Sequence, residues 1–203
     1  NIAAILTFIA AVIAGLPAPM TAVQVLWINL IADGPPALAL GLDKPNRRTM
    51  DRPPRPANAH ILSWPRLWRM TLVAVVMAAG TLAVLATADH NRGITYATTF
   101  AFTTFVLFQV ANALNVRTEH ESAFSRTVPT NWWLLGSLAL VVGMQVLVVH
   151  LPLLQGLFDT VALDPQHWIA AAAIASLAVV VGELDKTVRR HRRRHGHPGR
   201  EGL

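Results

Sequence analysis

The chain has no cysteine, and charged residues make up only 14% of its 203 residues. The absence of cysteine excludes disulfide bonds and thiolate metal sites. The sequence also has no serine or cysteine triad, no glycine-rich phosphate loop and no pair of facing carboxylates, which are the usual patterns of hydrolases and nucleotide-binding enzymes. Hydrophobic residues make up 53% of the chain and occur in long blocks. This composition is typical of a protein that crosses a membrane several times.

Six apolar blocks predict an all-α fold, a polytopic transmembrane helix bundle. The predicted spans are residues 1–16, 21–42, 67–88, 94–114, 132–154 and 167–184. All but the first are long enough to cross a hydrocarbon core of about 30 Å, and the first resembles the second half of a longer helix. A soluble helical domain would instead carry polar stripes along its helices. We therefore expect residues 1–185 to form a transmembrane domain that belongs to a larger protein.

The basic residues predict how the chain crosses the membrane. Of the 17 Lys and Arg residues, only Arg92 lies on one predicted side, and the others lie toward the opposite side or in the tail. Because cytoplasmic loops carry the excess of Lys and Arg, we expect a cytoplasmic C-terminus and a multi-pass protein of a bacterial plasma membrane. Residues 186–203 predict a basic, disordered tail that attracts anionic lipid. Nucleic acid is not an expected partner, because no fold presents these charges.

Asp33 is the one acidic residue in the middle of a predicted span. It lies in the stretch "INLIADGPPALALG", whereas the other ten acidic residues lie in loops, at span ends or in the tail. An aspartate at the centre of a membrane helix costs about 2.5–3.5 kcal/mol, so such a residue is a functional hypothesis by default. Asn29 precedes Asp33 by four residues, which places both side chains on one helix face. Amide and carboxylate oxygens suit Ca²⁺, and Mn²⁺ accepts them too.

Two prolines predict further oxygen ligands from the backbone. Pro35 and Pro36 have no N–H group, so the carbonyls of Ile31 and Ala32 lose their α-helical donors. We expect the second span to unwind at Asp33-Gly34-Pro35-Pro36. Free carbonyls inside a membrane are tolerated where they face a cavity or an ion, as in the broken helices of transporters. The alternative is a packing kink in which water satisfies the aspartate.

A second pair of polar residues lies in the fourth apolar block. Gln109 and Asn112 are three residues apart and share a helix face. Either side chain could supply an oxygen ligand or form a hydrogen bond between helices. For amides in membrane helices the hydrogen bond is the more common role.

Four stretches carry a family resemblance: "GLPAPMTAVQVLWINLIADGPPALALGLDKPNRRTMDRPPR", "FVLFQVANALNVRTEHES", "NWWLLGSLALVVG" and "GELDKTVRR". Together they resemble the fifth to tenth membrane helices of the P-type cation-transporting ATPases, in the calcium-pump branch. The resemblance implies a pump in which ATP phosphorylates an aspartate and the cycle moves Ca²⁺, or in some members Mn²⁺. ATP and Mg²⁺ would act only in cytoplasmic domains, since the phosphorylation motif Asp-Lys-Thr-Gly is absent here.

The same resemblance implies a ligand set and a list of partners. Asn29 and Asp33 match the family's ligands on the sixth helix, and Asn1 matches an asparagine on the fifth. Gln109 takes the position of a possible fourth ligand. The expected partners are the lipid bilayer and the N-terminal helices and cytoplasmic domains of the same pump. The chain alone is not expected to hydrolyse ATP or to bind the ion tightly.

Departures from the pattern imply one transported ion per cycle. The two-site calcium pump has glutamates where this chain has Ala4 and Gln109, and a threonine where it has Ala32. The amino-acid sequence around Asp33 is similar to that of the secretory-pathway calcium pumps. Two other functions stay open: a pump for H⁺ or Na⁺, and a membrane protein without catalytic activity that assists assembly.

Overall fold

Every regular element in the described part of the chain is a helix. The computed structural model describes residues 2–42, 64–88, 92–117 and 131–195. The elements are α1 (Ile2–Ile13), α2 (Ala22–Trp27), η1 (Ile28–Asp33), α3 (Gly34–Gly41), α4 (Trp64–Thr87), α5 (Ile94–Arg117), α6 (Trp132–His150), α7 (Pro152–Phe158) and α8 (Pro165–His195). Five helical stretches are long and apolar enough to cross a membrane: Ala22–Gly41, Leu67–Thr87, Ile94–Arg117, Trp132–His150 and Pro165–Thr187. With the shorter apolar helix α1, they confirm the predicted polytopic helical bundle.

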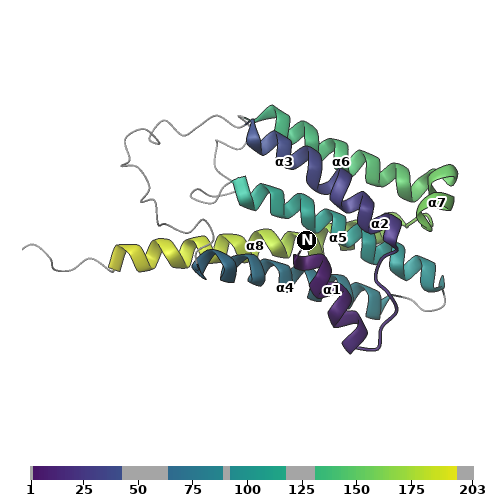
Figure 1. Cartoon of the computed structure of the whole chain (residues 1–203), viewed down its shortest axis with the longest axis horizontal. Helices are drawn as coiled ribbons and strands as arrows, with labels where there is room; N and C mark the ends of the chain where they lie inside the picture. Colours follow the sequence, from purple (N-terminus) through teal and green to yellow (C-terminus); the bar gives the residue numbers. More distant parts are fainter. Residues whose placement is uncertain (1, 43–63, 89–91, 118–130, 196–203) are drawn as a thin grey trace, which may run out of the picture.

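Helix α5 lies at the centre of the bundle. Figure 1 shows it between a pair formed by α3 and α6 and a pair formed by α4 and α8, and it packs against helices of both pairs. Its phenylalanines Phe102, Phe105 and Phe108 are fully buried. Because lipid tails are as apolar as these side chains, close packing rather than escape from water stabilises such contacts.

One glycine sets how closely three helices approach. A Cβ atom on Gly80 of α4 would lie 2.6 Å from Cζ of Phe108 and 3.2 Å from Cγ2 of Ile174 in α8. Small residues at such contacts let membrane helices approach closely. The glycine therefore leaves room for the buried phenyl ring of α5.

A polar cluster joins the N-terminal ends of α5 and α8. The Arg92 guanidinium bonds the Asp164 carboxylate and donates to the Tyr96 hydroxyl at 3.1 Å. The same hydroxyl lies 2.9 Å from Nδ1 of His167. The hydrogen bond from Arg92 holds the pKa of Asp164 below its ordinary value, and the pair raises the pKa of Arg92. This end of the bundle is thus tied by charge as well as by packing.

Two helix ends differ from those predicted. The span predicted for residues 132–154 ends as α6 at His150, because Leu151 is extended before Pro152 and a separate helix, α7, follows. Residues 186–195, where the sequence led us to expect the start of a disordered tail, continue α8. Neither Gly nor Pro occurs between Gly182 and Gly196, and Arg and Leu favour helix. The rest of the expected tail lies outside the described residues.

Candidate functional site

The candidate site lies on the helical stretch Ala22–Gly41, which we call the site helix. It begins with a capping box, in which the Thr21 hydroxyl accepts from the Gln24 backbone N–H at 3.3 Å. The Gln24 side chain accepts from the Thr21 N–H at 3.1 Å in return. These two bonds satisfy donors that a helix start leaves free. The site helix is therefore fixed at its first residue.

The expected unwinding at Asp33-Gly34-Pro35-Pro36 is wrong, because the site helix continues through this stretch. Its six residues Ile28–Asp33 form a π-helix, in which each bond spans five residues rather than four. Gly34 then begins α3, and the prolines lie in the first turn of that helix. Proline is tolerated there because a first-turn N–H has no partner within the helix. The prolines thus lie where π-helical bonding returns to α-helical bonding, and they do not break the site helix.

The π-helical geometry changes which carbonyl is free. The residues four and five positions after Ile31 are Pro35 and Pro36, so its carbonyl has neither an α-helical nor a π-helical donor. The carbonyl of Ala32 lacks only the donor four positions on, since Ala37 follows at five. Of the two predicted backbone ligands, Ile31 therefore has the stronger chemical basis.

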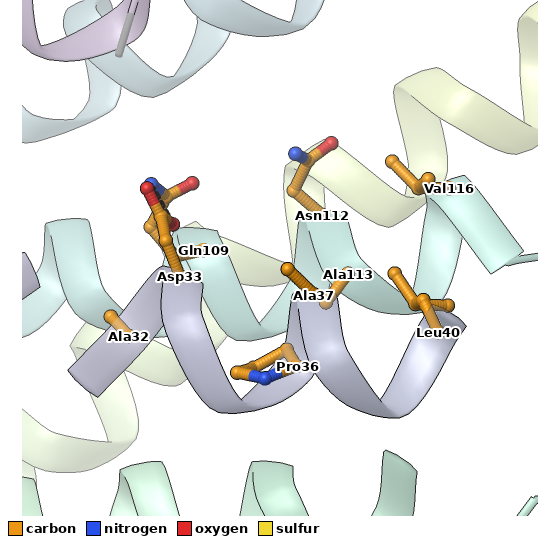
Figure 2. A pocket seen from close by; sticks show the side chains of 9 residues that line it. All are labelled: Ala32, Asp33, Pro36, Ala37, Leu40, Gln109, Asn112, Ala113 and Val116. Carbon is orange, nitrogen blue, oxygen red and sulfur yellow. Dashed lines mark hydrogen bonds between the residues drawn. The ribbon is translucent and has the colours of Figure 1, made fainter. Parts of the chain in front are cut away.

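Asp33 and Gln109 meet between the site helix and α5. Gln109 Nε2 donates to Asp33 Oδ1 at 2.7 Å. Both residues line an open-sided pocket of about 190 Å³ between α3 and α5. Figure 2 shows the two side chains together, with Asn112 farther along α5 on the same side of the pocket. The carboxylate thus faces a neighbouring protein helix, and three polar side chains line one side of an otherwise apolar space.

The other predicted ligands lie elsewhere or outside the described residues. Asn29 is exposed on η1, and Asn1 is not among the residues that the structure describes. Within the described ranges, no three His, Cys, Asp or Glu side chains come together. One carboxylate does not balance a divalent cation in a medium of low dielectric constant. A complete site would therefore need a second carboxylate as well as further oxygen ligands beside Asp33.

The sequence interpretation overlooked Gln145, another amide inside an apolar block. Its side chain is fully buried, accepts from Trp27 Nε1 at 3.2 Å and donates to the Thr103 hydroxyl at 3.2 Å. The signal that singled out Gln109, an amide in the middle of a span, was equally present here. What the sequence did not contain was its contact with the site helix.

Comparisons of the sequence with known proteins identify the family of this chain. Residues 17–188 match the family described as "Cation transporting ATPase, C-terminus". The chain is 31% identical over 179 residues to a calcium-transporting ATPase of Bacillus subtilis, which covers 87% of the chain and 20% of that protein. It is 34% identical over 179 residues to calcium-transporting ATPase 1 of Schizosaccharomyces pombe, with 88% and 20% covered. Calcium-transporting ATPase type 2C member 2 of Mus musculus is 34% identical over 192 residues, with 92% and 20% covered.

The chain spans about one fifth of the length of these curated relatives. The match covers the five membrane-spanning stretches from the site helix to α8 and includes Asp33 and Gln109. On this evidence the chain belongs to the cation-transporting ATPase family and corresponds to the family's C-terminal region.

Proposed function

We propose that this chain is the transmembrane ion-translocation region of an ATP-driven pump for a divalent cation. Ca²⁺ is the first choice of cargo, because the relatives above are named calcium-transporting ATPases. Mn²⁺ is the second, because it accepts the same oxygen ligands. The observation that carries the proposal is the Asp33 carboxylate, which sits at the end of a π-helical segment and faces α5. Segments of this kind occur frequently at functional sites.

In this proposal one cation binds at the level of η1. Asp33 supplies the negative charge, Asn29 an amide oxygen, and Ile31 and Ala32 backbone carbonyl oxygens. Asn1 supplies another amide oxygen from the N-terminal end of the chain. Gln109 joins the set when its amide turns, so that Oε1 rather than Nε2 faces the cation. These are the hard oxygen ligands that Ca²⁺ prefers, with six to eight of them in a typical site.

The chain's own residues have two tasks in transport. While the site is empty, the N–H group of Gln109 stabilises the Asp33 carboxylate, which would otherwise be a costly charge inside the membrane. When the cation arrives, it replaces that donor. Phosphorylation by ATP with Mg²⁺, and a second carboxylate for the cation, come from other regions of the pump. The C-terminus lies in the cytoplasm of a bacterial cell in this proposal, where the basic end of α8 meets anionic lipid.

The test is cation-dependent phosphorylation of the full-length pump that contains this chain. We expect Asp33→Asn to raise the Ca²⁺ concentration for half-maximal phosphorylation by more than about 100-fold, the upper range for residues that merely support a metal ligand. Asp159→Asn is the matched control, because Asp159 is an exposed residue that follows α7. We expect this variant to keep the Ca²⁺ dependence of the wild type.

Three outcomes contradict the proposal in different ways. Unchanged Ca²⁺ dependence in Asp33→Asn removes this residue from the site. Phosphorylation that requires Na⁺, or that proceeds without any added metal cargo, indicates a Na⁺ or H⁺ pump. A wild-type protein that is never phosphorylated by ATP supports a membrane protein without catalytic activity.

A further inference from the structure

Helix α6 is bonded to both halves of the site helix. Near one end of α6, the buried Gln145 accepts the indole N–H of Trp27, the last residue of α2. At the other end, Asn131 Nδ2 donates to the Ala39 carbonyl of α3 at 3.1 Å. Asn131 also caps α6, since its Oδ1 accepts from the Leu134 N–H at 3.0 Å. Helix α6 and its N-cap residue therefore hold the site helix on either side of Asp33.

Packing reinforces each of these two attachments. On the α2 side the packing comes from α7, which follows α6: Gln24 Nε2 donates to the Phe158 carbonyl at 2.8 Å, and the rings of Trp27 and Phe158 meet edge to face with centroids 5.0 Å apart. On the α3 side, Ala39 packs in a buried cluster with Leu134 and Leu138 of α6. Buried side chains of this kind have little freedom to move apart.

The segment between the two attachments has a different neighbour. η1 packs against α5, where Gln109 bonds Asp33. Gln145 also bonds Thr103, so α6 is itself fixed to α5. Helices α5 and α6 are therefore bonded to each other and to the site helix around η1. Within the site helix, η1 is the segment that departs from α-helical bonding.

We propose that α6 fixes both ends of the site helix and confines its conformational change to η1, which makes Gln145 and Asn131 positioning residues for Asp33. This inference rests on the proposed function. A π-helical turn holds an extra residue, and moving by one residue in an α-helix rotates a side chain by about 100° about the axis. If the extra residue shifts within η1, Asp33 turns relative to α5 while α2 and α3 stay in place.

The experiment measures the Ca²⁺ dependence and the maximum of phosphorylation separately, in the full-length pump. Trp27→Phe removes the bond to Gln145 and keeps an aromatic ring, whereas Gln145→Leu removes that bond and also the bond to Thr103. We expect Trp27→Phe to raise the half-maximal Ca²⁺ concentration about three- to tenfold, the effect of losing one buried hydrogen bond, and Gln145→Leu to raise it at least as much. The maximum phosphorylation level stays near the wild-type level. The double variant shows the same shift as Gln145→Leu alone, because that variant has already lost the bond that Trp27→Phe removes.

Two further variants separate positioning from general loosening. Asn131→Ser keeps a capping hydroxyl for α6 but loses the donor to Ala39, and it shifts the Ca²⁺ dependence in the same direction. Gln155→Leu is the control, since its bond to the Val149 carbonyl lies at the end of α6 and does not reach the site helix. It keeps the wild-type Ca²⁺ dependence.

The inference is overturned if Trp27→Phe and Gln145→Leu respond to Ca²⁺ like the wild type, or if Gln155→Leu shifts as much as they do. Should Gln145→Leu fail to fold, as judged by its thermal unfolding midpoint in detergent, Trp27→Phe decides the matter. A wild-type protein without Ca²⁺-dependent phosphorylation refutes the proposed function itself, which is a separate result.

Discussion

Among single residues, Gln109 provides a hydrogen bond to the Asp33 carboxylate from the neighbouring helix. A neutral amide satisfies the carboxylate with an N–H group and brings no charge of its own. An acid at this position would have to share a proton with Asp33, because two carboxylates at hydrogen-bond distance cannot both stay ionised. The choice of an amide at position 109 thus limits how strongly protons compete with the cation.

This argument predicts the behaviour of Gln109→Glu. We expect the variant to bind Ca²⁺ more tightly than the wild type at high pH, because a second carboxylate offsets the charge of the cation. We also expect its affinity to fall more steeply on acidification, because a shared proton must leave before Ca²⁺ binds. The half-maximal Ca²⁺ concentration is measured at about pH 6 and about pH 8. The value at the higher pH reports the affinity, and the difference between the two values reports the competition by protons. Gln166→Glu, at an exposed position in α8, serves as the control. Parallel pH profiles for Gln109→Glu and wild type would contradict the argument.

The sequence was sufficient to single out Asp33, since an acid inside an apolar block is costly wherever it lies. It could not choose between the two roles of Gln109, because spacing along one helix does not say which helix lies opposite. The structure shows a hydrogen bond between Gln109 of α5 and Asp33 of the site helix. The ligand role stays a prediction. Gln145 was missed for the same reason, as its importance comes from contact with Trp27.

At the scale of elements, the site helix shows why local rules did not predict the whole geometry. The sequence correctly indicated a change in helical hydrogen bonding near Pro35 and Pro36, because two consecutive residues without an N–H group cannot donate to the preceding turn. Whether the chain unwinds at the prolines or forms a π-helical segment depends on the side chains packed against it. Ile28 and Ala32 of η1 are nearly fully buried in the core cluster, and this packing favours a helix that stays continuous. A π-helical segment keeps the side chains packed while it accommodates the prolines.

Helix packing around Gly80 predicts a loss of stability in Gly80→Ala. Alanine favours helix over glycine by about 1 kcal/mol. Its Cβ, however, would overlap the buried Phe108 ring, and overpacking costs about 1–3 kcal/mol. We expect the cost to exceed the gain, which lowers the thermal unfolding midpoint in detergent. Gly143→Ala in α6 is the matched control, because its Cβ meets no atom within 4 Å and helix propensity alone acts. A midpoint that rises in both variants would contradict the packing argument.

Across the whole molecule, charge and hydrogen bonding hold one end of the bundle and the candidate site lies toward the other. The site helix, α5 and α6 surround Asp33, whereas Arg92, Asp164 and their neighbours join the starts of α5 and α8. The sequence predicted the number and order of the spans, which depend on hydrophobic length alone. It did not predict this joint between α5 and α8, because the two partners are far apart along the chain. The joint provides a test of how the bundle responds to pH.

The Arg92–Asp164 pair predicts that acid loosens the joint between α5 and α8. Arg92 holds the pKa of Asp164 below the ordinary value of 3.8, so the pair stabilises the folded state fully above that value. The stabilisation is lost as the pH falls through the lower pKa of the folded protein, when the carboxylate takes up a proton. Since both side chains are about half exposed, salt screens the pair and the effect is small. Thermal unfolding midpoints of the wild type and Asp164→Asn, compared between neutral pH and pH values below 3.8, should converge in acid. A gap between them that persists in acid would show that Asp164 acts through its hydrogen bonds to Arg92 and Tyr96 rather than through its charge.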